Sequence, residues 1–177
     1  MDKKIITIGA STSKNSINKV LAEYTGGLIN SGEIINVDLN NYEMPLFSLD
    51  VEAENGFPKG AIQLNELLDE TDGFIISFAE HNGAYSAAFK NAFDWLSRID
   101  GKVWRDKPML LLATSPGERG GQTVLDIALG RFPFNGGKIV GSMSFPSFFE
   151  NFKNGEIVNE HLKSDLLERV KDFQQAI

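Results

Sequence analysis

Five short apolar runs recur along the chain, and each one is bounded by turn residues. They lie at Lys4–Gly9, Glu33–Leu39, Gly73–Phe78, Pro108–Thr114 and Lys138–Met143. Runs of this length that contain β-branched residues and do not alternate with polar ones are typical of strands buried on both faces. The pattern therefore predicts a sheet whose strands are parallel and covered.

Segments with apolar residues at helical spacing separate these runs. Apolar stripes lie in Ile17–Leu28, Ala88–Leu96, Val124–Phe132 and Leu162–Ile177, with a weaker one in Lys59–Glu70. Strands that alternate with amphipathic helices indicate an α/β protein whose parallel sheet has helices on both faces. Five such units fit the flavodoxin-like three-layer sandwich, a five-stranded parallel sheet with strand order 2-1-3-4-5.

The length of 177 residues is typical of one domain, so we expect residues 1–177 to form a single unit. One long stretch, Asn40–Pro58, shows neither strand nor helix periodicity. A loop of this length in a compact domain is usually functional or a partner surface.

Composition and charge exclude several classes of function. The chain has no cysteine, hence no disulfide, thiolate ligand or cysteine nucleophile, and its two histidines are too far apart to suggest a metal site. A net charge of −7 argues against binding to nucleic acid or to an anionic membrane. No apolar stretch is long enough for a membrane span or a signal peptide, so a cytoplasmic protein is expected.

Polar residues follow the first run in the stretch "GASTSKNSIN", Gly9–Asn18. Serine and asparagine are the usual caps of a helix, so this stretch is read either as an ordinary cap or as an anion cradle. A helix N-terminus offers free N–H groups, and hydroxyl groups add further donors. A nucleoside triphosphatase loop is excluded, because the glycines and the Lys-Ser/Thr pair of that motif are absent.

Two more loops are expected at the same edge of the sheet, after the third and fourth strands. "FAEHNGAYS", Phe78–Ser86, contains the turn signal Asn-Gly and a histidine that we expect to be exposed. "TSPGERGGQT", Thr114–Thr123, contains three glycines, which serve a turn or a close approach to a ligand. The three loops together favour a flat cofactor that carries a phosphate.

These loops and the helix after the second one resemble a known family. "ASTSKNSIN", "AEHN", "FKNAFDWLSR" and "SPGERGG" are similar to the motifs G-S-x-R-x-x-S-x-N, P-E-Y-N, L-K-N-A-x-D-W and S-x-G-x-x-G-G. These are motifs of the NAD(P)H-dependent flavin mononucleotide (FMN) reductases, whose fold is flavodoxin-like. Quinone, azo-dye and chromate reductases belong to the same family.

The resemblance implies where the flavin binds. For the phosphate it implies Ser11, Ser13, Lys14, Ser16, Ile17 and Asn18 with the neighbouring backbone; for the isoalloxazine ring, Ala79, Glu80, His81, Asn82 and Gly83; and for the other ring edge and the ribityl chain, Ser115, Pro116 and Gly117. The sequence departs from the family motifs at Ser13, which replaces an arginine, at Ala79, which replaces a proline, and at His81, which replaces a tyrosine.

The resemblance further implies a ping-pong reaction. NADPH or NADH reduces bound FMN, and a flavin, quinone, azo compound or similar small electron acceptor reoxidises it, with no catalytic side chain. It also implies a homodimer or homotetramer, and we expect Trp95, which lies off the apolar stripe of its helix, to be exposed in an interface. The alternatives are a flavodoxin-type electron carrier, favoured by the acidic residues of Asn40–Pro58, and a binding module that has lost its flavin.

Overall fold

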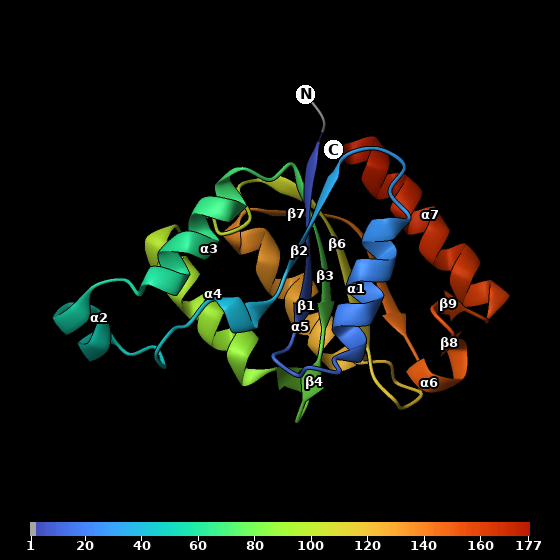
Figure 1. Cartoon of the computed structure of the whole chain (residues 1–177), viewed down its shortest axis with the longest axis horizontal. Coiled ribbons are helices and arrows are strands. Elements are labelled where there is room, and N and C mark those ends of the chain that lie inside the picture. The colour runs from blue at the N-terminus through green and yellow to red at the C-terminus, as the bar shows by residue number, and fades with distance from the viewer. Residues whose placement is uncertain (1–2) are drawn as a thin grey trace.

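A parallel five-stranded sheet runs through the middle of the protein, with helices on both faces (Figure 1). The computed structural model describes residues 3–177, so Met1 and Asp2 of the predicted domain lie outside it. The strands of the sheet are β1 (Lys4–Ala10), β2 (Glu33–Val37), β3 (Gly73–Phe78), β6 (Lys107–Thr114) and β7 (Gly137–Phe145). Their order is β2-β1-β3-β6-β7, which confirms the predicted topology.

The helices form the two outer layers. They are α1 (Ile17–Gly27), α2 (Leu49–Asn55), α3 (Lys59–Asp69), α4 (Ala87–Ile99), α5 (Gln122–Arg131), α6 (Phe148–Asn151) and α7 (Glu160–Ala176), with 3-10 turns η1 (Leu39–Asn41) and η2 (Phe132–Asn135). Helices α1 and α7 cover one face, and α3, α4 and α5 cover the other (Figure 1). Within residues 3–177, no helix combines the length and apolar character that a membrane crossing needs.

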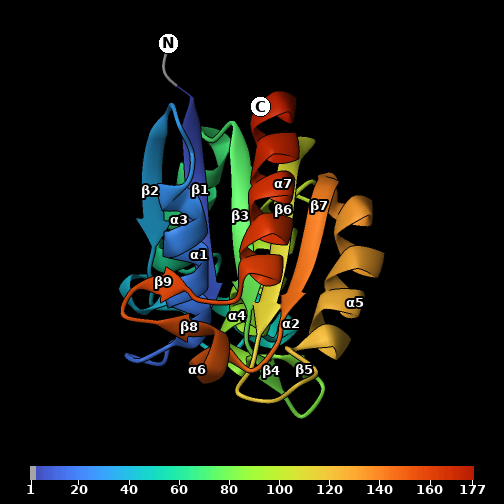
Figure 2. The ribbon, with the colours of Figure 1, turned by 90° about the vertical axis from the view of Figure 1, so that its right-hand side faces the viewer.

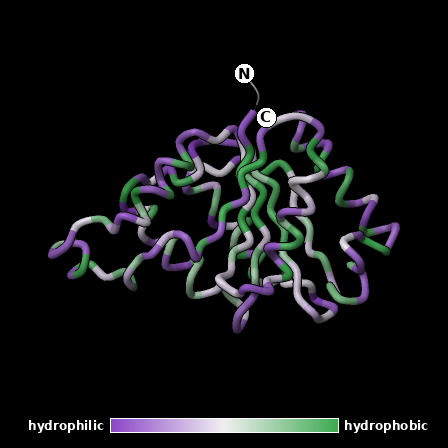
Figure 3. Tube along the Cα trace, in the orientation of Figure 1, coloured by the Kyte–Doolittle hydropathy of each residue, from purple (hydrophilic) through white to green (hydrophobic). Residues whose placement is uncertain are grey.

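The sheet separates two apolar cores, and its central strands contribute to both. Along β3, Phe74, Ile76 and Phe78 pack under α3, α4 and α5, whereas Ile75 packs under α1 and α7. Successive side chains of a strand point to opposite faces, so a strand covered on both sides is apolar throughout. Figure 3 shows this concentration of hydrophobic residues in the central strands.

The stretch Asn40–Pro58 is more ordered than the sequence predicts. It contains the end of η1 and all of α2, which Ser48 caps by accepting a hydrogen bond from Val51 N at 3.1 Å. Helix α2 buries no residue and stands away from the body of the protein (Figure 1). With no apolar stripe to bury, α2 gives no periodic signal in the sequence.

The expectation that Trp95 is exposed is wrong. Trp95 is fully buried, because the chain leading to α2 covers the second face of α4. Its indole Nε1 donates to Pro45 O at 2.8 Å, and its ring meets Phe47 edge to face at 5.0 Å. A tryptophan off the main stripe of a helix can thus be buried by a segment that has no periodicity of its own.

Candidate functional site

Three loops meet at the carboxyl end of the sheet, where they leave the adjacent strands β1, β3 and β6. Between them lies a hollow of about 190 Å³. It is lined by Ser11, Ser13, Asn15, Ser16, Ile17, Asn18, Ala79, Glu80, His81, Thr114, Ser115 and Pro116. Most of the residues predicted for the flavin site therefore lie together. Four predicted residues are on the same loops but do not line the hollow: Lys14, Asn82, Gly83 and Gly117. The motifs did not indicate two of the lining residues, Asn15 and Thr114.

The first loop, between β1 and α1, is rich in hydrogen-bond donors without a partner among the described residues. Ser16 caps α1 by accepting from Lys19 N at 3.1 Å, and Ser11 Oγ accepts from Ser13 N at 3.1 Å. Each hydroxyl keeps its own proton for a further acceptor. Within residues 3–177, the backbone N–H groups of Lys14 and Asn15 have no acceptor. No acidic residue lies in the first turn of α1, so the loop suits an anion.

Gly9 lets the first loop lie close to the sheet. A Cβ atom at this position would overlap the backbone of Lys19 in the first turn of α1. Only glycine allows this approach without a shift of the helix. The first residue of the stretch "GASTSKNSIN" therefore fixes where the N-terminus of α1 stands relative to β1.

Asn18 connects the strands and the helix that carry the site. Its side chain is buried, and its Oδ1 accepts from Ser77 Oγ at 2.7 Å and from Thr114 N at 3.0 Å. Its Nδ2 donates to Thr114 O at 3.0 Å. These bonds join α1 to β3 and β6, so the carboxamide oxygen is fully used and the side chain mainly positions the first and third loops.

The second loop is a tight hairpin of β4 (Glu80–His81) and β5 (Ala84–Tyr85) (Figure 2). Asn82 and Gly83 have φ angles of 53° and 74°, the left-handed pair that a type I′ turn requires. The predicted turn is confirmed, and His81 is exposed as expected. Glu80 Oε2 accepts from Val124 N at 3.1 Å in the first turn of α5, whose N-cap Gly121 has no side chain. The hairpin is thereby fixed to α5.

The glycines of the third loop serve the turn rather than the hollow. Gly120 and Gly121 have φ angles of 57° and 76°, and a Cβ atom at Gly120 would lie 2.5 Å from Ser144 Oγ. Backbone bonds tie this loop to the start of α6: Ser147 N donates to Gly117 O at 2.9 Å and Phe148 N to Ser115 O at 3.1 Å. The structure shows the first of the two uses open to these glycines, the turn, in which Gly120 passes close to β7.

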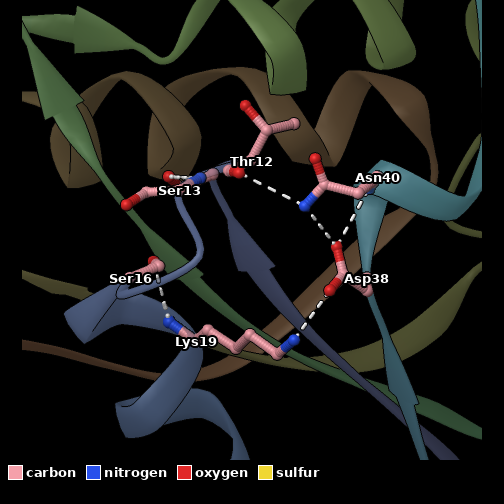
Figure 4. Close-up of polar contacts among 7 residues, drawn as sticks. Thr12, Ser13, Ser16, Lys19, Asp38 and Asn40 are labelled. Atoms are coloured by element: carbon pink, nitrogen blue, oxygen red, sulfur yellow. Dashed lines mark hydrogen bonds and ion pairs between the residues drawn. The ribbon is translucent and has the colours of Figure 1, made fainter.

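A polar network that the sequence did not indicate supports the outer side of the first loop (Figure 4). Asp38 lies directly after β2, and its Oδ2 accepts a hydrogen bond from Lys19 Nζ at 2.7 Å. Its Oδ1 accepts hydrogen bonds from Asn40. Asn40 Nδ2 in turn donates to Thr12 O at 3.2 Å. The Lys19 hydrogen bond lowers the pKa of Asp38 to about 2, so the network is charged and intact at neutral pH.

In the part of the chain that the structure describes, residues 3–177, histidine, aspartate and glutamate form no group of three or more that could hold a metal ion. The site instead combines free backbone amides, hydroxyl groups and an exposed hairpin. Together with the sheet order, these features define a flavodoxin-like α/β protein with hydrogen-bond donors, unpaired in the described part of the chain, at the carboxyl edge of its sheet.

A family model described as NADPH-dependent FMN reductase matches residues 3–150. The chain belongs to this family, and the predicted resemblance is confirmed.

Curated relatives agree with the family. The quinone reductase of Escherichia coli (strain K12) is 31% identical over 118 residues, which are 67% of this chain and 63% of that protein. An NAD(P)H-dependent FMN reductase of Pseudomonas aeruginosa is 30% identical over 120 residues, again 67% and 63%. This chain thus spans less than two thirds of the length of these relatives.

The fold is also that of a solved structure. FerB, a flavoenzyme NAD(P)H:(acceptor) oxidoreductase from Paracoccus denitrificans, has a TM-score of 0.79 at 23% identity. The similarity covers 98% of this chain and 96% of that one. The flavodoxin-like architecture is therefore shared over nearly the whole length of both chains.

Proposed function

We propose that this protein is an NAD(P)H-dependent oxidoreductase that binds FMN and reduces a flavin, quinone, azo compound or similar small acceptor. The observation that carries the proposal is the first loop, whose hydroxyls and unpaired amides meet the hairpin and the third loop in a chain of the FMN reductase family. When bound, FMN supplies the electron transfer between nicotinamide and acceptor. The protein binds and orients it.

The residues present fit this cofactor. In the proposal, the hydroxyls of Ser11 and Ser16 and the free amides of the first loop hold the phosphate. The hairpin residues Glu80–Gly83 line the ring, and Ser115–Gly117 line the ribityl side. His81 is exposed on the hairpin and receives no acid-base role, so no catalytic side chain is assigned. A cytoplasmic location, where reduced nicotinamide nucleotides are available, and a single domain are part of the same proposal.

Anaerobic addition of NADPH or NADH to the FMN-loaded protein tests this function. Bleaching of the flavin absorption within the turnover time is expected, followed by its return when a quinone is added. Steady-state rates with varied NADPH and quinone should give parallel double-reciprocal lines, since both molecules use the site in turn. A flavin band that NADPH and NADH leave unchanged contradicts the proposal.

The electron-carrier alternative depends on the acidic residues around α2, and one of these is already engaged. Glu52 accepts two hydrogen bonds from Arg98, at 2.8 and 3.1 Å. It therefore offers less charge to a basic partner than the sequence suggests. The same anaerobic titration separates the two functions, because a carrier needs another protein to reduce its flavin.

The homodimer is also a proposal, and the segment that carries α2 supports it. Leu46 and Leu49 are 80% and 66% exposed, although the segment is held firmly to α4 by Asn91, Trp95 and Arg98. A seven-residue helix with no buried side chain has little stability of its own. Packing against a second copy would cover these leucines.

Replacement of Leu46 and Leu49 by glutamate tests this assembly. The double variant is expected to sediment as a monomer where the wild type sediments as a dimer. Leu167→Glu, which changes a 45% exposed leucine on α7, is the control and should leave the dimer intact. A monomeric wild type would contradict the dimer without touching the proposed activity.

A further inference from the structure

The peptide between Thr12 and Ser13 has a defined orientation at the candidate phosphate site. Its N–H points inward, where Ser13 N donates to Ser11 Oγ at 3.1 Å. Its carbonyl points outward, where Thr12 O accepts from Asn40 Nδ2 at 3.2 Å. The N–H and C=O of a trans peptide point in opposite directions. The bond from Asn40 therefore selects which of the two groups faces the hollow.

Asn40 is itself held in place (Figure 4). Asp38 Oδ1 accepts from Asn40 N at 2.9 Å and from Asn40 Nδ2 at 2.8 Å, so the amide nitrogen, with its two protons, faces both Asp38 and Thr12. Lys19 Nζ lies 2.7 Å from the other oxygen of Asp38 and balances its charge. The network has no net charge to offer an anion, so its effect on the loop is one of orientation.

We propose that Asn40 is a positioning residue for the FMN phosphate, supported by Asp38 and Lys19. It keeps the Ser13 N–H on Ser11 Oγ, which leaves the Ser11 hydroxyl proton for the phosphate, and it keeps the Thr12 carbonyl away from the hollow. A flipped peptide would place a carbonyl oxygen against the phosphate, which is repulsive. The loop depends on such donors because Ser13 has no charge. This inference rests on the proposed FMN binding.

The test compares FMN with riboflavin, which has the same ring and ribityl chain without the phosphate. In Asn40→Ala, the Kd for FMN should rise about tenfold, the effect of one lost hydrogen bond to a charged group, while the Kd for riboflavin stays within about twofold. Asn40→Asp keeps the size of the side chain but removes both donors and adds a charge, so it should weaken FMN binding further. Asn41→Ala is the matched control: Asn41 is exposed on the same turn, and its side chain makes no hydrogen bond within residues 3–177.

A purely structural role for Asn40 gives a different result. If Asn40→Ala weakens FMN and riboflavin by the same factor, or weakens neither, the positioning role is overturned while FMN binding by the wild type stands. A wild type that binds no FMN contradicts the proposed function itself. Asn40 is exposed, so the variants should unfold within a few degrees of the wild type, which a thermal melt checks.

Discussion

Each end of the parallel sheet has an ion pair between a lysine and a carboxylate, but the surroundings of the two pairs differ. At the amino end, Lys4 Nζ lies 2.7 Å from Glu70, whose side chain is 63% exposed. At the carboxyl end, Lys19 Nζ lies 2.7 Å from Asp38, whose second oxygen holds Asn40. Exposed ion pairs contribute little to stability. The second pair acts by orienting the first loop through Asn40. The lysine–carboxylate distance, 2.7 Å in both pairs, does not show this difference.

The two ends of the sheet also each have a glycine, and the space around these two glycines differs. Substitution of the more crowded one gives the largest expected effect on stability. A Cβ atom at Gly9, at the carboxyl end of β1, would overlap the backbone of Lys19. Gly9→Ala should therefore lower the free energy of unfolding by about 3 kcal/mol through overpacking. Gly101, near the amino end, has no atom within 4 Å of such a Cβ, and Gly101→Ala should change it by less than about 0.5 kcal/mol. Urea unfolding measures both, and equal effects would show that the approach of α1 to β1 is not tight.

A comparison of Ser16 with Ser48 separates helix capping from ligand binding. Ser16 and Ser48 each cap a helix by accepting a backbone hydrogen bond at 3.1 Å, but only Ser16 lines the hollow. Each change to alanine should lower the free energy of unfolding by about 1 kcal/mol. Only Ser16→Ala should also raise the Kd for FMN, by about tenfold. A similar rise in Ser48→Ala would mean that helix stability, and not the hydroxyl, determines binding.

The pH dependence of stability tests the charge of Asp38 in the second ion pair. The pKa of Asp38 is lowered to about 2, so its stabilising charge is fully present above the unfolded pKa near 4 and is lost as the pH falls toward 2. Asp38→Asn should lower the free energy of unfolding by about 1 kcal/mol at pH 7, and by progressively less below pH 4. Glu70→Gln should have a smaller effect at pH 7. Chemical unfolding at pH 7, 5 and 3 measures both variants, and a pH-independent loss in Asp38→Asn would contradict the charged network.

The smallest effect is expected at Lys14, an exposed side chain on the first loop that does not line the hollow. Lys14→Ala should raise the Kd for FMN by about threefold, since an exposed charge acts weakly through water. Ser11→Ala should raise it more. Lys171→Ala, at an exposed lysine on α7, is the control. A larger loss in Lys14→Ala than in Ser16→Ala, measured by flavin fluorescence, would reverse the ranking.

The sheet and its order could be predicted because each central strand is buried on both faces, and burial of this kind leaves an uninterrupted apolar run. Ile5 and Ile6 of β1, for example, are fully buried in opposite cores. The positions of the three loops follow from the strand order alone. The turn at Asn82 and Gly83 was predictable because its left-handed backbone favours these residue types.

The remaining features depend on contacts between distant segments, which no local period records. Trp95 is buried by Pro45 and Phe47, about fifty residues earlier in the chain. Asn40 reaches Thr12 only because β2 lies beside β1 and ends at the same edge. One signal was present in the sequence: Asp38 lies near the end of the second apolar run and has asparagine two residues later, the spacing of an Asx turn.

Titration of the purified protein with FMN, followed by absorption and fluorescence, tests the central claim most directly. We predict saturable binding of one FMN per chain, with a shifted flavin band, and markedly weaker binding of riboflavin because the first loop holds the phosphate. A spectrum equal to the sum of free FMN and protein at every ratio would contradict the assignment of this edge as a flavin site.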